Sequence, residues 1–482
     1  MDAKTIRGLG PALDKFLAEF DDCFPRWDTR AHLPVYVNGQ LSDLKRKSVE
    51  PIALASGVPV RTLQEFLSQY SWAEDRMIDQ LQHIVVRDHS GSHAIGSIDE
   101  TSFVKKGEKT PGVQRQHCGT VGKQDNCIVT VHLGYACGGF HCLLDGELFL
   151  PESWSDDRER CAEAGIPDDV VYRPKSVIGL ELYDRARNNG VVFEWLTFDE
   201  WYGAKPEFLR GLDDRKQRFV AEVHKHFVGW IDPPKVTSRR YRRRRRQRIV
   251  AGGRRPRYVE DLAKNHPELR VQPWQPYRVK DGEKGPIVWE TKHAMITPKD
   301  AEGLPAGKPY HLLIARNVLN RDDVKYFVSN APPETSVETL LLVAFSRWPV
   351  ERCFEDQKGE VGMAHYEGRR YIGLKRHLAI TAVSYLFLSR VREDLEKKRA
   401  GADGVPGTSG GFGRDPVPVL EWTSNNGTGR QGGKHDRIPP ASGRRRPCQP
   451  PQDNHSQTTR RRHQAHRNQK VQVGHELGNI AL

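Results

Sequence analysis

Three acidic residues in this sequence lie in contexts from which their carboxylates could act together. Asp99 closes the apolar stretch AIGSID and Asp199 closes VVFEWLTFD, so both are predicted at the ends of strands. Glu351 lies on a predicted helix in RWPVERCFEDQKGEVG. A strand end fixes the position of a side chain while the following loop admits a ligand. Taken singly, an aspartate after a strand is more often a turn former.

The chemistry that these residue types allow depends on their meeting in the fold. Carboxylates at close range repel one another unless a cation compensates their charge. Oxygen ligands suit Mg²⁺ or Mn²⁺. Two such ions can activate a nucleophile and stabilise the leaving oxygen of a phosphodiester. The three acids therefore predict metal-dependent phosphodiester chemistry, provided that separate elements bring them to one place.

The predicted helix around Glu351 has an apolar side and a charged side. The apolar side is formed by Val350, Phe354 and Val361. The charged side carries Arg347, Glu351, Glu355 and Lys358. Steps of three and four residues align side chains on one face of a helix. An amphipathic surface helix with internal ion pairs is the ordinary interpretation, and Glu355 competes with Glu351 for the role of a metal ligand.

Composition narrows the class of protein and the kind of partner. The 482-residue chain carries a net charge of +13, and eight of the ten residues from Arg239 to Arg248 are arginine. An excess of positive charge favours nucleic acid as the partner, although a basic surface without a partner is an alternative. The cysteines form no CxxC pair, which argues against a disulfide framework and a structural zinc site. Without a recognisable signal peptide or bilayer-spanning apolar run, we expect a soluble intracellular protein with no membrane partner.

Hydrophobic periodicity indicates helices over residues 10–88 and strands from about residue 94. Within the helical part, residues 52–68 read as a helix, a turn at Gly57 and a second helix. This layout fits either a helix-turn-helix, with Arg61 on the second helix as a DNA contact, or a plain helical hairpin. The strands that follow, mixed with a helix, predict an α/β or α+β core.

Two further segments differ from this core in composition and in hydrophobic periodicity. Residues 228–310 contain prolines and short strand-like pieces, which predict a β-rich insertion with a basic loop. From about residue 396 all periodicity is lost, so a disordered basic tail is expected. A frameshift after about residue 395 is one hypothesis for this tail, and translation of the other reading frames would test it.

Taken together, these segments resemble the DDE transposases of bacterial insertion sequences. Within them the chain is most similar to the group whose third acid lies in a Tyr-x2-Arg-x3-Glu-x6-Lys signature. Arg347, Glu351 and Lys358 match this spacing, whereas Ala344 stands at the tyrosine position. SIDETSFVKKG resembles the loop of the first acid and DEWYG that of the second. RQHCGTVGKQDNC and GMAHYEGRRYIGLKRHLAITAVSYLFL resemble the stretches that follow the first and third acids.

The resemblance implies an α/β fold with an RNase H-like catalytic core interrupted by the β-rich insertion. It implies Asp99, Asp199 and Glu351 as catalytic residues and as ligands of two Mg²⁺ or Mn²⁺ ions. Metal-activated water would cut the DNA at the end of the element, and the freed 3′-hydroxyl would attack target DNA. The expected partners are the double-stranded DNA of the terminal inverted repeats and of the target, with a homodimer as one option in the complex. The bacterial cytoplasm, at the nucleoid, is the expected location.

Candidate DNA contacts follow from the same resemblance and from the basic segments. Arg347 is expected to clamp a phosphate in bidentate fashion, and Lys358 to act as a point charge. The remaining candidates are basic residues of loops, the second helix and the arginine run: Lys105, Lys106, Arg61, Arg242, Arg243 and Arg244. Trp201 and Tyr202 could stack on a base or pack over the strand end.

The expected domain order is helical, core, insertion, core and tail: 1–90, 91–227, 228–310, 311–395 and 396–482. The alternative function is a catalytically inactive transposase remnant that only binds DNA. A hydrolase that acts on sugars through a carboxylate pair explains neither the net charge nor the arginine run.

Overall fold

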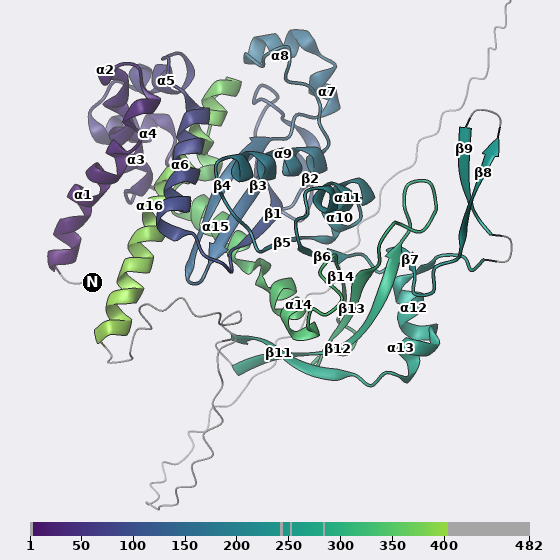
Figure 1. Ribbon diagram of the computed structural model, residues 1–482. Coiled ribbons are helices and arrows are strands. Elements are labelled where there is room, and N and C mark those ends of the chain that lie inside the picture. Colours follow the sequence, from purple (N-terminus) through teal and green to yellow (C-terminus); the bar gives the residue numbers. More distant parts are fainter. Residues whose placement is uncertain (1–2, 242–243, 251–252, 283–284, 403–482) are drawn as a thin grey trace, which may run out of the picture. The chain divides into compact units, whose positions relative to one another are not determined.

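The computed structural model describes residues 3–241, 244–250, 253–282 and 285–402. These residues form a mixed α/β structure around a sheet of 12 strands, and a separate two-stranded sheet is formed by β8 and β9. Figure 1 shows the sheet with helices on either side of its central strands. Among the described residues, no helix is long and apolar enough to cross a membrane.

The central part of the sheet is formed by five strands. They are β1 (Ile95–Val104), β3 (Lys123–Cys137), β4 (Phe140–Leu148), β5 (Trp195–Phe198) and β6 (Phe219–Val223). β3 lies antiparallel between β1 and β4, whereas β5 runs parallel to β1 and β6 parallel to β5. The middle of β3 is buried without interruption, as expected for a strand that is covered on both faces.

The remaining strands extend this sheet at both sides. They are β2 (Gln114–Cys118), β7 (Val228–Trp230), β10 (Arg257–Tyr258), β11 (Gln275–Gly282), β12 (Gly285–Pro298), β13 (Tyr310–Asn317) and β14 (Val324–Ser329). β14 pairs with β6, and β13, β12 and β7 follow in turn. The β-rich segment after residue 228 therefore continues the sheet of the core, and the strand-turn-strand of β13 and β14 belongs to the same extension.

The helices cover the sheet and form a bundle at the N-terminal end of the chain. The N-terminal helices are α1 (Ala3–Ala18), α2 (Trp27–Arg30), α3 (His32–Leu41), α4 (Val49–Ser56), α5 (Val60–Ser68) and α6 (Glu74–His89), with the 3₁₀ turn η1 (Asp21–Cys23). The middle of the chain forms α7 (Glu152–Ser155), α8 (Arg158–Ala164), α9 (Lys175–Asn188), α10 (Glu200–Gly203), α11 (Pro206–Asp214), α12 (Val259–Asn265) and α13 (Pro267–Val271). The last helices are α14 (Val337–Ala344), η2 (Phe345–Arg347), α15 (Trp348–Gly359), η3 (Met363–His365) and α16 (Tyr371–Ala402).

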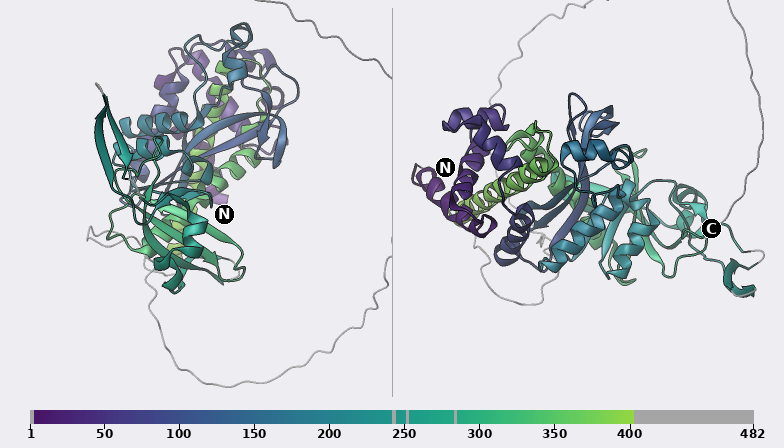
Figure 2. Two further views of the ribbon diagram at one scale, coloured as in Figure 1. Left: turned by 90° about the vertical axis from the view of Figure 1, so that its right-hand side faces the viewer. Right: turned by 90° about the horizontal axis from the view of Figure 1, so that it is seen from above.

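The long helix α16 holds the N-terminal helices to the rest of the chain. It packs against α3, α5 and α6, and Figure 2 (right) shows it beside them. Buried hydrogen bonds cross this contact: the Tyr36 hydroxyl lies 3.0 Å from Nδ1 of His377, and Gln40 donates to the Thr381 hydroxyl over 2.9 Å. The helix–glycine–helix layout is present as α4 and α5, with Gly57 between them in the left-handed conformation that glycine favours.

Helices α9 and α15 lie on opposite faces of the central strands. Successive residues of β1 point to opposite faces: Ile98 faces Gly179 of α9, and Asp99 faces Arg347 at the start of α15. Gly134 of β3 lies directly under Val350, where an added Cβ would be 3.1 Å from the valine side chain. The absence of a side chain at Gly134 lets the start of α15 approach the sheet.

Three expectations about local structure need correction. β1 continues through Asp99 to Val104, because the backbone of β3 pairs with it along its whole length. FHCLLDGELFLP, whose pattern predicts a pair of strands, forms the single strand β4. The arginine-rich segment forms paired strands where a basic loop was expected: β8 (Val236–Tyr241) and β9 (Arg244–Ile249).

The end of α16 also changes an expectation about the C-terminal tail. The helix continues to Ala402, so residues 396–402, which the sequence assigned to the tail, are helical. The reason is their composition, because EKKRA consists of strong helix formers. Residues 403–482, on which the expectation of disorder and the frameshift hypothesis fall, lie outside the described residues.

Candidate active site

The parallel strands β1, β5 and β6 bring acidic residues to one edge. Ile98 pairs with Phe198, and Phe198 pairs with Ala221. The residue that follows each of them is an acid: Asp99, Asp199 and Glu222. Because adjacent parallel strands are about 4.8 Å apart, these acids occupy neighbouring positions. The parallel register thus places the two aspartates that the sequence singled out side by side.

Asp199 is fixed by the helix that it begins. Its carboxylate accepts hydrogen bonds from the backbone N–H groups of Trp201, over 3.0 Å, and Tyr202, over 3.2 Å. Both donors are unpaired first-turn groups of α10, so Asp199 is the N-cap of that helix. The short strand and the cap together determine where this carboxylate lies.

Arg347 joins the first aspartate to the acid on α15. Its Nη1 lies 2.9 Å from Oδ2 of Asp99, and its Nη2 lies 3.1 Å from Oε1 of Glu351. The guanidinium therefore stands between two of the three acids that the sequence predicted to meet. Asp99 is buried, whereas the Glu351 side chain is 57% exposed, so Glu351 can reorient without unpacking the core.

The environment of Asp99 disfavours its charged form. Burial raises the pKa of Asp99 to about 7, although Arg347 lowers it, and the nearby Asp199 raises it further. A cation in closer contact than a guanidinium would favour the ionised carboxylate. The site is thus an acidic edge that needs positive charge to be fully ionised at neutral pH.

The apolar side of α15 anchors the helix as expected. Val350 and Phe354 of α15 are buried; Val361 is also buried, but it follows the end of the helix at Gly359. The Phe354 ring packs edge-on against buried His132 of β3, with 5.4 Å between ring centroids. Glu355 lies on the other side: it is 73% exposed and pairs with Arg352 over 3.4 Å. The structure therefore places Glu351, and not Glu355, next to the acidic edge.

Three candidate lysines lie around the first-acid strand and have different surroundings. Lys358 donates to the Thr120 hydroxyl over 2.9 Å, and burial lowers its pKa. Lys105 donates to the backbone carbonyls of Ala364 and Tyr366, over 3.2 and 2.6 Å, and burial lowers its pKa to about 8. The Lys105 ammonium is therefore already satisfied within the chain, whereas Lys106 is exposed.

The other basic candidates lie on separate elements. Arg61 is on the exposed side of α5, with a side chain 83% exposed and paired with Glu65 over 2.7 Å. Arg244 begins β9, the second strand of the arginine-rich hairpin. Arg242 and Arg243 lie outside the described residues.

Sequence reasoning missed one acid at this edge, Glu222. Glu222 follows Ala221 in β6 and pairs with Lys325 of β14 over 2.7 Å. Only the parallel register of β5 and β6 shows its proximity to Asp199, since FVAEV alone reads as an ordinary strand. Trp201 and Tyr202, in contrast, were singled out from the sequence. The ammonium groups of Lys175 and Lys205 lie 5.2 Å and 4.7 Å from the centroid of the Trp201 ring. Tyr202 is fully buried and packs under the strand end.

The three predicted ligands do not form a metal-binding cluster as they stand. Among the residues that the structure describes, no group of three or more His, Cys, Asp or Glu side chains is arranged to hold a metal ion. The guanidinium of Arg347 lies between two of them, with its nitrogens 2.9 Å from Asp99 and 3.1 Å from Glu351, so these carboxylates are separated by its width. The donor chemistry nevertheless suits a hard divalent cation, because the acids offer oxygen ligands and a positive group already lies between them.

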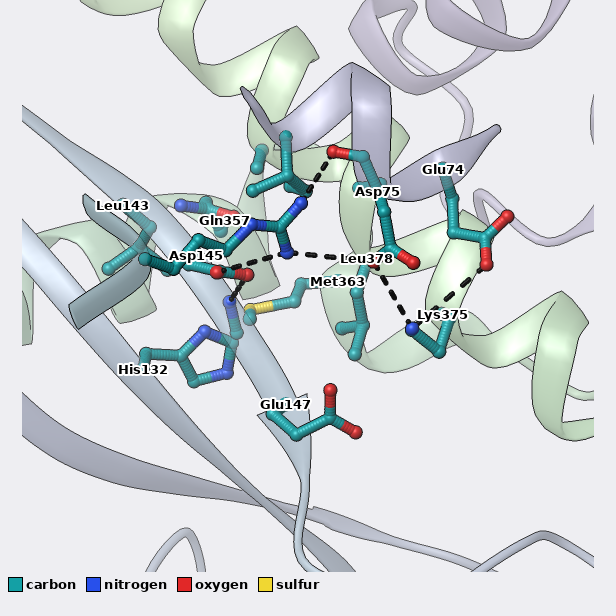
Figure 3. A pocket seen from close by; sticks show the side chains of 15 residues that line it. Glu74, Asp75, His132, Leu143, Asp145, Glu147, Gln357, Met363, Lys375 and Leu378 are labelled. Carbon is teal, nitrogen blue, oxygen red and sulfur yellow. Dashed lines mark hydrogen bonds and ion pairs between the residues drawn. The ribbon is translucent and has the colours of Figure 1, made fainter. Parts of the chain in front are cut away.

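A second polar cluster contains none of the three predicted acids and is formed by side chains of α6, β4, α9, α15 and α16 (Figure 3). Buried Asp145 of β4 pairs with Arg185 of α9 over 3.3 Å. Lys375 of α16 lies 3.3 Å from Asp75 of α6. Figure 3 shows Gln357 of α15 beside this cluster, and its buried amide has no hydrogen-bond partner among the described residues. These residues line a small cavity of about 30 Å³, large enough for a water molecule.

Comparisons with known proteins bear on the family of this chain. Over 300 residues the chain is 29% identical to "Probable transposase for insertion sequence element IS701" of Microchaete diplosiphon, which covers 60% of this chain and 74% of that protein. Among solved structures, the NurA nuclease from Sulfolobus solfataricus matches 68% of this chain and 92% of its own, at 9% identity. Its TM-score of 0.26 supports no argument about fold or function. Residues 19–286, which include Asp99 and Asp199, match the family described as "DDE superfamily endonuclease". Because this match spans more than half of the chain, the protein belongs to the DDE superfamily endonucleases.

Proposed function

We propose that this protein is a transposase of an insertion sequence, which cleaves DNA at the ends of its element and joins the freed strand to target DNA. The family supports DNA cleavage, and the name of the IS701 relative supports transposition. The observation that carries the proposal is the position of Arg347. One guanidinium contacts both Asp99 and Glu351. Asp199 directly follows β5, which pairs in parallel with β1, so it lies next to Asp99.

The proposed catalytic acids are Asp99, Asp199 and Glu351. Asp99 lies in β1, Asp199 directly follows β5, and Glu351 lies on α15, which packs on β3 and β4. Three antiparallel strands followed by two parallel ones support an RNase H-like core. In this proposal residues 228–310 are an insertion whose strands extend the core sheet, and α15 in the second part of the core, residues 311–395, brings the third acid back to it.

The acids would hold divalent cations, Mg²⁺ or Mn²⁺, through carboxylate oxygens. When bound, a pair of such ions supplies an activated water molecule and stabilises the leaving oxygen of the phosphodiester. The chain's own residues prepare this site. The N-cap hydrogen bonds orient Asp199, and the packing of Val350 and Phe354 holds the start of α15 against β3.

DNA would approach along the basic groups around this edge. Lys358 and Arg347 flank the acids and would contact the phosphates of the strand being cut. Arg61 on α5 is exposed. The arginine-rich strands β8 and β9 form a sheet that is separate from the main one. Arg61 and these strands would hold DNA beyond the cleavage point. Lys106 is exposed in the loop after β1, whereas Lys105 would act by positioning the segment around Tyr366.

The decisive experiment compares two glutamates on the same helix. We expect Glu351→Gln to reduce cleavage of DNA that carries the terminal inverted repeats by at least about a thousandfold, because it removes an acidic ligand. Glu355→Gln is the matched control: it lies one turn away and is exposed, so it should leave cleavage unchanged. Gel analysis of labelled DNA with Mg²⁺ measures both rates. Equal cleavage by the two variants would reject Glu351 as the third acid.

Asp99→Asn separates an enzyme from the inactive remnant. An active transposase should lose Mg²⁺-dependent cleavage in this variant and retain DNA binding, measured by fluorescence anisotropy. A remnant would show no cleavage in the wild type, while binding would persist in both proteins. Detection of cleaved ends in the wild type therefore excludes the remnant.

A further inference from the structure

The Arg347 guanidinium already contacts carboxylates of its own chain, whereas an arginine that is free to clamp a phosphate would point to solvent. Arg347 lies where the turn η2 passes into α15, and its guanidinium is directed inward to Asp99 and Glu351. Its side chain is only 24% exposed. Charges on Asp99, Glu351, Asp199 and Glu222 all raise its pKa, against the effect of burial. Arginine remains a cation under such conditions.

Three lysines near this edge have hydrogen-bond or ion-pair partners of their own. Lys358 donates to Thr120, Lys325 pairs with Glu222, and Lys175 pairs with Glu100 over 2.7 Å. Asp99 is buried beside Asp199, and a buried carboxylate without compensating charge is costly. The guanidinium of Arg347 therefore supplies positive charge at the point where the acids come together.

A divalent ion would need the same oxygen atoms. Magnesium binds carboxylate oxygens at about 2.0–2.1 Å. The Arg347 nitrogens lie 2.9 Å from Oδ2 of Asp99 and 3.1 Å from Oε1 of Glu351. The acids cannot close around an ion while a planar guanidinium fills the space between them. Arginine and ion are thus alternative occupants of these oxygens.

We propose that Arg347 is a resident counter-cation of the acidic edge, which competes with divalent ions for Asp99 and Glu351. This inference rests on the proposed function of the acids. Without DNA, Arg347 keeps the acids compensated and lowers their affinity for the ion. A DNA phosphate offers Arg347 a bidentate partner outside the acid cluster, and its departure opens the carboxylates to the ion. Metal loading is thereby linked to DNA binding.

The test measures Mn²⁺ binding by the full chain without DNA. Electron paramagnetic resonance of free Mn²⁺ gives the dissociation constant. We expect Arg347→Gln to bind Mn²⁺ about tenfold more tightly than the wild type, because the competing charge is gone. Arg352→Gln is the matched control on the same helix. Arg352 pairs with Glu355 and Asp356, away from the acidic edge, so its loss should not change Mn²⁺ affinity.

Thermal unfolding provides a second readout. In EDTA, Arg347→Gln should unfold at a lower temperature than the wild type, because Asp99 loses its compensating charge. Saturating Mn²⁺ should raise its midpoint more than it raises that of the wild type or of Arg352→Gln. Arg347→Lys retains a compact charge and should fall between wild type and Arg347→Gln in Mn²⁺ affinity, which keeps the test available if the glutamine variant does not fold.

The outcomes separate this inference from the function on which it rests. If Arg347→Gln and Arg347→Lys bind Mn²⁺ no more tightly than the wild type, the competition is rejected. Asp99→Asn tests the acids themselves and should weaken Mn²⁺ binding. If it does so while the Arg347 variants match the wild type, only the counter-cation role fails. If Asp99→Asn binds Mn²⁺ like the wild type, the assignment of the metal site fails as well.

Discussion

Individual buried charges determine much of the behaviour of this protein. Asp99 at the acidic edge and Asp145 of β4 are both buried carboxylates whose closest cation is an arginine. They differ in what surrounds them. Asp99 has a second aspartate on the neighbouring strand, whereas Asp145 faces a small cavity between helices. The first arrangement suits a cation site, and the second suits a structural ion pair.

The pH dependence of the free energy of unfolding should report the ionisation of Asp145. Burial raises its pKa from 3.8 to about 6, although Arg185 and the N–H of Gly146 lower it. Between these two pKa values the folded state holds a proton that the unfolded state has released. The contribution of this carboxyl to stability is therefore greatest below pH 3.8 and is lost as the pH rises through about 6. We expect this carboxyl to cost the folded state about 3 kcal/mol between pH 4 and pH 7.

Urea unfolding of the wild type and of Asp145→Asn at several pH values checks this expectation. The asparagine variant cannot ionise, so the difference between the two free energies of unfolding should shift by that amount in favour of the variant as the pH rises. A difference that does not change between pH 4 and pH 7 would contradict the assignment.

At the scale of elements, short segments hold the acids in register. The turn from β5 into α10 brings Gly203 against the backbone of β6, where an added Cβ would overlap the carbonyl oxygen of Glu222. This close approach lets α10 fold back over the sheet edge, so the N-cap Asp199 lies beside Asp99. The glycine is required for space, since its backbone conformation is not left-handed.

Gly203→Ala should therefore damage both stability and cleavage. We expect a loss of about 1–3 kcal/mol in the free energy of unfolding and a fall in cleavage of about tenfold to a hundredfold, because Asp199 is displaced. Gly359→Ala in α15 is the matched control. Nothing lies within 4 Å of its added Cβ, so it should fold and cleave like the wild type. Cleavage by Gly203→Ala at the wild-type rate would show that α10 does not position the second acid.

At the scale of the whole molecule, charge dominates the expected encounter with DNA. A net charge of +13 favours binding through phosphates, which releases counterions. If about six or more phosphates are neutralised, DNA affinity should fall by about a thousandfold or more between 50 and 200 mM salt. Anisotropy titrations over this range measure the slope of log affinity against log salt concentration.

One variant pair assigns a part of that slope to the N-terminal helices. Arg61→Gln should reduce the slope by about one. Arg26→Gln removes a comparably exposed arginine that pairs with Asp28, before α2, and should leave the slope unchanged. A slope that is equal in all three proteins would place α5 away from the DNA.

The sequence by itself determined the local features of this protein. Period and composition predicted the N-terminal helices, the strands of the core and the apolar side of α15, because side chains at fixed spacings share one face of their element. They also marked Asp99, Asp199 and Glu351 as acids with special contexts. These features depend on residues close together in the chain, so the sequence pattern contains them directly.

Only the tertiary structure decided how these features meet. The parallel pairing of β5 and β6 brings Glu222 to the acidic edge, and the antiparallel pairing of β3 with β1 carries β1 on past Asp99. In both cases, backbone hydrogen bonds between strands that are separated in the chain set the register. The position of Arg347 between Asp99 and Glu351 likewise joins residues that are far apart in the chain. Such contacts depend on packing and on desolvated charge, which no local spacing records, and they determine where a cation can bind.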